Sequence, residues 1–183
     1  MITLRHCKTA IAIAALFGAS GAFAATMSKS EYAAAKDHIS ADYKADKAAC
    51  ASSSGNAKDV CMEQAKGKEK IARAELEYDH SGKAGDAHKL AIAKADSAYA
   101  IAKEMCDDKA GNAKDVCTTE AKATHTKAVA DAKLTEKVGE ARKDAAQDKS
   151  DANYKVATQK CDSLAGDAKA SCISAAKAHF NKN

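Results

Sequence analysis

Small and apolar residues recur along the chain at the spacing of an α-helix. The clearest run lies in the middle of the sequence, where such residues follow one another at intervals of three and four positions. Its members are Ile92, Ala95, Tyr99, Ala102 and Cys106. Because residues three and four positions apart lie on one side of a helix, this run predicts a helical face that packs against the rest of the protein.

The same pattern repeats three times around pairs of cysteines. The segment GNAKDVC occurs at residues 55–61 and 111–117, and a looser copy, GDAKASC, occurs at 166–172. The cysteine that ends each copy lies eleven positions after another cysteine, in a C-x10-C pattern. This spacing pairs Cys50 with Cys61, Cys106 with Cys117 and Cys161 with Cys172. A tyrosine stands two helical turns before the first cysteine of each pair, and we predict that these tyrosines, Tyr43, Tyr99 and Tyr154, are packing residues. An internal repeat of this kind indicates tandem helical units.

The spacing within each cysteine pair predicts a reversal of the chain. In a continuous helix the eleven residues from Cys50 to Cys61 would separate the two by about 16 Å, whereas a disulfide needs Cα atoms within roughly 7 Å. Glycine suits a left-handed position at the end of a helix, and Asn or Asp is a strong N-cap for the next one. The predicted turn residues are Gly55 and Asn56, Gly111 and Asn112, and Gly166 and Asp167. Six cysteines allow 15 pairings, and we favour the three local ones because all share one spacing and one turn.

These signals predict an all-α protein made of three antiparallel helical hairpins in tandem, each closed by one disulfide across its turn. Ser28 and Glu31 have the form of a capping box, which places a helix start there. The six expected helices span residues 29–52, 57–79, 87–108, 113–133, 140–164 and 168–181, and the hairpins span 29–79, 87–133 and 140–181. The linker at 81–89 should break the helix because it has two glycines, whereas the similar linker at 135–143 has only Gly139 and either breaks or continues as a bent helix. Packing of the hairpins into one bundle or in series stays open.

The composition agrees with a helical protein that has a thin core. Alanine supplies 46 of the 183 residues, proline is absent, and only 18 residues after position 24 are Val, Ile, Leu, Phe or Met. Such a low content of large apolar residues usually accompanies disorder. Alanine is nevertheless the strongest helix former, with Lys, Glu and Gln close behind. The chain therefore favours helix throughout, and the disulfides are the expected source of extra stability.

The N-terminus has the features of a secretory signal. Arg5 and Lys8 precede an apolar run that is well short of the roughly 20 residues needed to span a bilayer, and Ala22-Phe23-Ala24 suits a signal peptidase. We therefore expect residues 1–24 to be a cleaved signal peptide and 25–183 to form the helical repeat region. Cys7 leaves with the signal, and six cysteines in an exported chain are typical of a disulfide framework. The expected location is periplasmic or secreted, with no stable membrane insertion after cleavage.

The remaining chemistry argues against catalysis and against a nucleic-acid partner. Without the signal's two basic residues the net charge is 27 − 25 = +2, and no basic stripe with interleaved aromatic residues is present. Five histidines remain, at positions 38, 80, 88, 125 and 179; none has metal-ligand spacing, and we expect them to be solvated. Phosphate-binding loops, nucleophile elbows and C-x-x-C motifs are missing. We expect no enzyme activity, no cofactor and no metal.

One further guide is a resemblance to other exported proteins. It is carried by the run MSKSEYAAAKDHISADYKADKAACASSSGNAKDVCMEQAKGKEKIARAELE, by the second GNAKDVC and by AGDAKASC. The chain resembles a group of small exported proteobacterial proteins of unassigned activity, often classed with TolA-type cell-envelope biogenesis proteins. With TolA itself the chain shares an Ala, Lys, Glu and Asp composition. The resemblance implies an exported protein of the cell envelope.

Our leading hypothesis is a non-catalytic periplasmic interaction or scaffold protein that presents helical faces to an envelope protein partner. One alternative is a thiol-based binder of metal or oxidant, in which the cysteine pairs are working thiols. A second is a weak binder of anionic membranes or peptidoglycan that uses equivalent basic positions of the repeats, namely Lys66, Lys122 and Lys177. The oligomeric state stays open.

Overall fold

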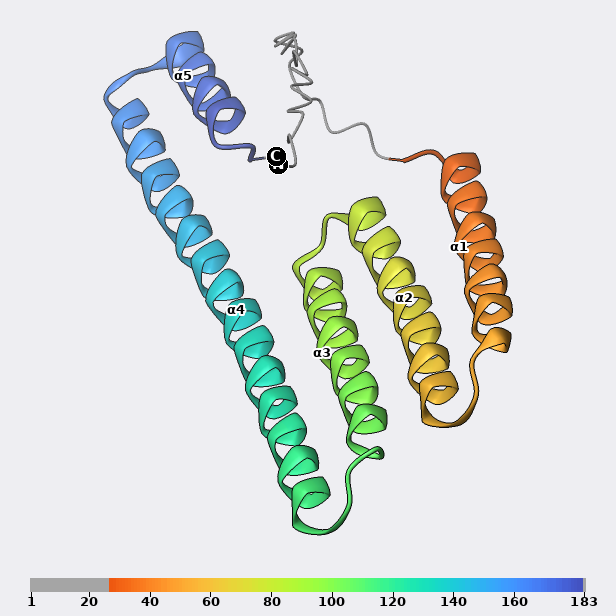
Figure 1. The fold of residues 1–183 in the computed structure, drawn as a ribbon. Coiled ribbons are helices and arrows are strands. Elements are labelled where there is room, and N and C mark those ends of the chain that lie inside the picture. The colour runs from red at the N-terminus through yellow and green to blue at the C-terminus, as the bar shows by residue number, and fades with distance from the viewer. Residues whose placement is uncertain (1–26, 183) are drawn as a thin grey trace, which may run out of the picture.

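The computed structural model describes residues 27–182, and the expected signal peptide at 1–24 lies outside them. The described chain is helical apart from its turns, which confirms the all-α prediction (Figure 1). The α-helices are α1 (Lys29–Ala49), α2 (Gly55–Ser81), α3 (Ala84–Cys106), α4 (Gly111–Lys160) and α5 (Gly166–His179). Short 3-10 helices, η1 (Cys50–Ser52) and η2 (Cys161–Ser163), extend α1 and α4.

The start of α1 confirms the predicted capping box. The backbone N–H of Glu31 donates to the Ser28 hydroxyl at 3.2 Å, and the Ser28 N–H donates to the Glu31 carboxylate at 2.8 Å. These two bonds satisfy backbone N–H groups that have no partner within the helix. Local sequence chemistry therefore sets where the first helix begins.

The prediction of six helices is wrong, because the described chain forms five. The two helices expected at 113–133 and 140–164 are one continuous helix, α4, which is 50 residues long. The first linker breaks as predicted: Gly82 ends α2 with a φ of +61° and donates its N–H to the Tyr78 carbonyl. The second linker has only Gly139, which matches the helical Gly85 of the first linker and not Gly82. Without a glycine at the left-handed position, the chain continues as helix.

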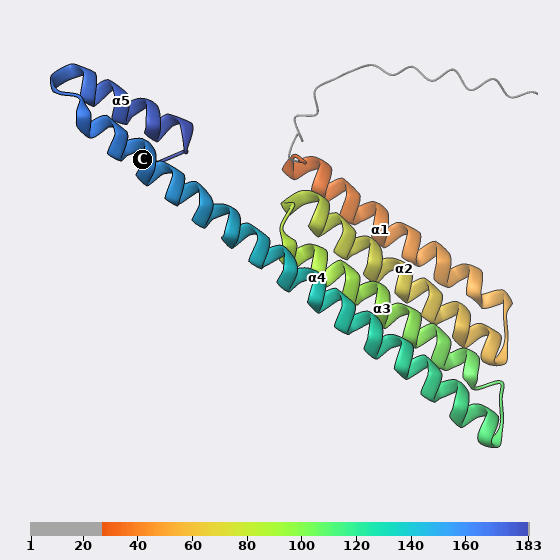
Figure 2. The ribbon, with the colours of Figure 1, turned by 90° about the vertical axis from the view of Figure 1, so that its left-hand side faces the viewer.

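The helices form an open layer that is one helix thick. Figures 1 and 2 both show α1, α2, α3 and the first half of α4 side by side, with consecutive helices running in opposite directions. Within residues 27–182 each helix packs only against its neighbours in sequence. A closed bundle would hide one face of every helix, whereas this layer leaves both broad faces in solvent.

The second half of α4 leaves the layer. Figure 2 shows it extending well past α3, with α5 folded back along its far end. Residues 137–149 are exposed on every side, so this stretch is an isolated helix between two packed regions. Ion pairs one turn apart support it, such as Lys137 with Glu140 at 2.6 Å.

The most extensive helix contact lies between α2 and α3. Gly67 is buried there, and a Cβ atom at Gly67 would lie only 3.0 Å from the Ser97 Cβ. Ser97 is itself buried, and its hydroxyl donates to the Ala93 carbonyl at 2.7 Å within its own helix. A glycine opposite a small residue allows two helix backbones to approach closely, and this contact fixes the register of α2 against α3.

Candidate interaction surface

The three local cysteine pairs are joined by disulfides. The Cα atoms of Cys50–Cys61, Cys106–Cys117 and Cys161–Cys172 are 5.6, 5.7 and 5.8 Å apart. In each pair the first cysteine is at most 1 % exposed and ends a helix, whereas the second is half-buried in the next helix. A thiolate released from the first cysteine would lie at the negative end of a helix macrodipole. This position favours the oxidised, structural form of each pair.

The turns keep the predicted glycine conformation but not the predicted cap. Gly55, Gly111 and Gly166 have φ of +55°, +54° and +58°, the left-handed region that favours glycine. We expected Asn56, Asn112 and Asp167 to be N-caps, and this is wrong. Each helix begins two residues earlier than predicted, at the glycine itself, and its N-cap position makes no side-chain hydrogen bond. The N-cap positions are Ser54, Ala110 and Ala165.

The repeated tyrosines are half-buried and occupy equivalent places between helices. Tyr99 stacks on His125 with ring centroids 5.0 Å apart, and Tyr154 meets the edge of Phe180 at 6.1 Å. His125 and Phe180 lie equally far after the second cysteines of their pairs. Tyr43 lines the groove between α1 and α2, below the ammonium of Lys47 at 5.2 Å. The tyrosines thus mark one repeated position in each disulfide-linked helix pair.

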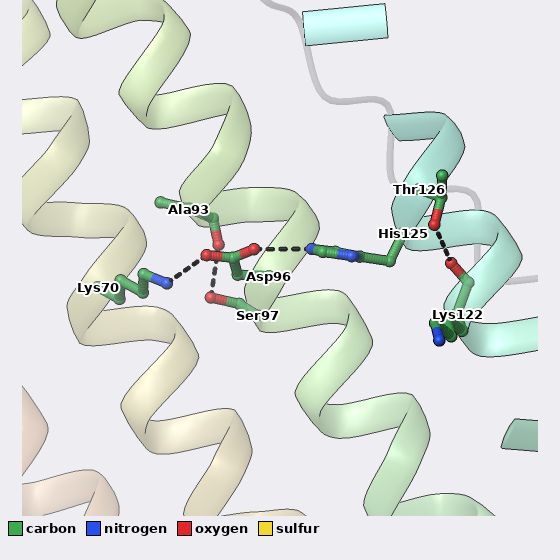
Figure 3. Close-up of polar contacts among 7 residues, drawn as sticks. All are labelled: Lys70, Ala93, Asp96, Ser97, Lys122, His125 and Thr126. Atoms are coloured by element: carbon green, nitrogen blue, oxygen red, sulfur yellow. Dashed lines mark hydrogen bonds and ion pairs between the residues drawn. The ribbon is translucent and has the colours of Figure 1, made fainter. Parts of the chain in front are cut away.

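A polar bridge across three helices is the most organised cluster of charged groups in the layer (Figure 3). The Asp96 carboxylate of α3 accepts from Lys70 Nζ of α2 and interacts with His125 Nε2 of α4, each at 2.7 Å. The expectation that His125 is solvated is wrong, since it is half-buried against Tyr99 and Asp96. The sequence did hold a signal for this contact: His125 stands at the same place in its repeat as Phe180, and each ring meets the tyrosine of its repeat. The bridge joins α2, α3 and α4 through side chains from all three helices.

The bridge predicts a loss of stability at low pH. The hydrogen bond from Lys70, followed by that from His125, lowers the pKa of Asp96 and outweighs the opposing effect of burial. A lowered pKa in the folded state adds stability above the unfolded pKa near 3.9, and this stability disappears as the pH falls through the folded value. The free energy of unfolding, measured with urea, should therefore fall as the pH drops below about 5, and it should fall less steeply in Asp96→Asn than in the parent protein. Asp79→Asn, at an exposed position of α2, is the control, and an equally reduced slope in both variants would contradict the prediction.

Two different grooves flank the contact between α2 and α3. One, of about 340 Å³, has an apolar floor that includes Ile71, Ala98 and Ile101, with Lys68 and Lys94 at its sides. The other, of about 140 Å³, is lined by the charged residues Glu63, Lys66, Lys70 and Asp96. Both grooves include Gly67 and Ser97, but their other α2 residues differ: Lys66 and Lys70 lie to one side of Gly67 along the helix surface, and Lys68 and Ile71 lie to the other. The grooves therefore open on opposite faces of the layer. The two broad faces therefore offer different chemistry to a partner.

The outer side of α4 carries a third exposed surface. Val116, Leu134, Val138 and Val156 are 41 to 63 % exposed. Because 18 residues make five helical turns, Leu134 lies directly in line with Val116, and Val156 with Val138. His125, which faces α3, is nine residues from Leu134 and so lies on the opposite side of the helix. We call Val116, Ala123, Ala130, Leu134, Val138, Ala141, Ala145, Ala152 and Val156 the outer stripe of α4.

The basic positions suggested for membrane or peptidoglycan binding are not alike in the structure. Lys66 forms an ion pair with Glu63 at 2.6 Å, Lys122 is exposed, and Lys177 is half-buried. Among residues 27–182, no helix combines the length and apolar character needed to cross a bilayer. In the same residues no group of three His, Cys, Asp or Glu side chains could hold a metal ion.

Comparisons with protein-family models, with curated proteins and with solved structures found no match to this chain.

Proposed function

We propose that this protein is a non-catalytic interaction or scaffold protein of the cell envelope, located in the periplasm or secreted. The supporting observation is the open layer, in which each described helix packs only against its sequence neighbours and both broad faces stay accessible. The three disulfides are consistent with an exported chain. Such a layer offers a long, rigid surface to a protein partner.

The tandem-hairpin interpretation of the repeat belongs to this proposal. The first half of α4 completes the second hairpin, and its second half begins the third, so that α4 serves two units. Each unit keeps one disulfide and one tyrosine in the same place. Repeated units of this kind build extended binding surfaces, because each one contacts only its neighbours.

The test is capture of a partner from the periplasm after mild cross-linking, with an unrelated secreted protein as control bait. We expect a partner enriched over the control, with cross-links concentrated on one face of the layer. Lys68 and Lys94 report on the apolar groove, whereas Lys66 and Lys70 report on the charged one. A result with no enrichment, or with cross-links spread evenly over both faces, would count against the proposal.

The state of the cysteines in the purified protein separates the proposal from the thiol-based alternative. Under the proposal, the intact mass should show three disulfides and a thiol titration should find no free cysteine, because the first cysteine of each pair is buried at a helix end. Non-reducing peptide mapping should recover only the three local pairs. Free thiols in stoichiometric amount, or a bound metal ion, would support the alternative instead.

A further inference from the structure

The two halves of the α4 outer stripe match the two sides of the α2–α3 interface. The repeat allows this comparison, because positions can be counted from equivalent cysteines. Ala123 lies as far after Cys117 as Gly67 lies after Cys61. By the same count Val116, Ala130 and Leu134 stand where α2 has Val60, Ala74 and Tyr78. The first half of the stripe therefore corresponds to the side of α2 on which α3 packs.

The second half of the stripe corresponds to the facing side of α3. Ala152 lies as far before Cys161 as Ser97 lies before Cys106. Ser97 is the residue that lies opposite Gly67 where α2 and α3 pack together. In the same way Ala145 and Val156 stand where α3 has Leu90 and Ile101. An Ala123–Ala152 contact would thus reproduce the Gly67–Ser97 contact with small residues on both sides.

The charges at the edge of this interface are repeated as well. Across α2 and α3, Lys94 Nζ lies 4.0 Å from a carboxylate oxygen of Glu75. Counted from the cysteines, Asp131 stands in the place of Glu75 and Lys149 in the place of Lys94. Asp131 is acidic like Glu75, and Lys149 is basic like Lys94. The two halves of α4 are therefore complementary in charge as well as in the size of their side chains.

A single straight α4 cannot bring these halves together. They lie on one line along the same helix, because the chain does not reverse at Gly139. Asp131 and Lys149 are 149 − 131 = 18 residues apart, which is about 27 Å along a helix. Both halves therefore stay exposed in one chain, although their counterparts in α2 and α3 bury each other.

We propose that two copies of this chain pair through their α4 helices. The helices run antiparallel, and the first half of each outer stripe packs on the second half of the other. The two-fold axis passes close to Val138, and each copy contributes the same surface, as in most symmetric dimers. The α3 and α5 helices lie away from the stripe, so α5 and the second half of α4 from one copy extend the layer of the other.

The test uses sedimentation equilibrium on the full disulfide-bonded protein, followed by zero-length cross-linking of carboxylates to lysines. We expect a dimer mass and an Asp131–Lys149 cross-link between copies. Leu134→Lys, at a position that is 63 % exposed, should raise the dimer dissociation constant at least ten-fold. Met105→Lys, which is 56 % exposed on α3 and outside the stripe, should leave it unchanged.

A charge swap sharpens the test. Asp131→Lys alone should weaken the dimer, and adding Lys149→Asp should restore it, because both symmetric pairs are then reversed. A monomer with no Asp131–Lys149 cross-link would overturn the proposal. A monomer with that cross-link inside one chain would also overturn it, since α4 would then bend at Gly139. If the dimer dissociation constant were the same in Leu134→Lys and in the charge-swap variants as in the parent protein, the copies would meet through another surface. That result would overturn the pairing through α4.

Discussion

Replacing both Cys106 and Cys117 by serine will lower the free energy of unfolding by about 2 to 3 kcal/mol while leaving most of the helix intact. The bridge closes a short loop, and in the chain-entropy model a loop of this size contributes about that amount by restricting the unfolded chain. The helices themselves depend on alanine-rich sequence and on contacts with their neighbours, which the serines leave in place. Urea unfolding followed by circular dichroism at 222 nm measures the effect.

The distal disulfide supplies the matched comparison. Cys161 and Cys172 join α4 to α5, which packs only on the end of α4 among the described helices. Serines at both positions should release α5 and leave the unfolding of α1–α3 nearly unchanged. A collapse of all helical signal in the Cys106 and Cys117 variant would contradict the prediction, because it would mean that one bridge holds the whole fold.

Gly67→Leu will destabilise the protein by about 2 to 3 kcal/mol, the upper part of the range for overfilling a packed site. Even the first added carbon would lie 3.0 Å from the Ser97 Cβ, and beyond it lies the Ile101 side chain. The helices must separate to admit the larger side chain, so the tight contact between Gly67 and Ser97 is lost. Thermal and urea unfolding of the variant against the parent protein measures the change.

Gly85→Leu is the control for Gly67→Leu, because it makes the same substitution at a helical position where no atom of another helix lies within 4 Å of the added Cβ. Leucine forms helix better than glycine, so Gly85→Leu should be neutral or stabilising by up to about 1 kcal/mol. Equal destabilisation by both variants would show that the loss comes from the leucine itself and not from the α2–α3 contact.

Several features of the candidate surface could be predicted only in part. The repeated tyrosines indicate packing positions, yet the residues that meet them come from the next helix, and the sequence predicts a solvated His125 where the structure has a half-buried one. Asp96 gave no signal in the sequence, because an acidic residue on a charged helix is usually solvated. Its importance comes from Lys70 and His125, which lie on two other helices. Such a cluster depends on the register between helices, which short-range patterns do not contain.

Short-range sequence patterns were enough to predict the helical class, the start of α1, the left-handed glycines and the cysteine pairing. All of these depend on interactions within about a dozen residues, such as the capping box at Ser28 and Glu31 and the reversal at Gly55. Three other features became visible only in the folded chain: α4 continues through Gly139, the layer stays open, and the outer stripe of α4 stays exposed. The open layer and the exposed stripe depend on which helices pack together, and short-range patterns do not contain that information. The helix through Gly139 has no packing partner over residues 137–149; it continues because no glycine stands at the left-handed place that Gly82 takes in the first linker.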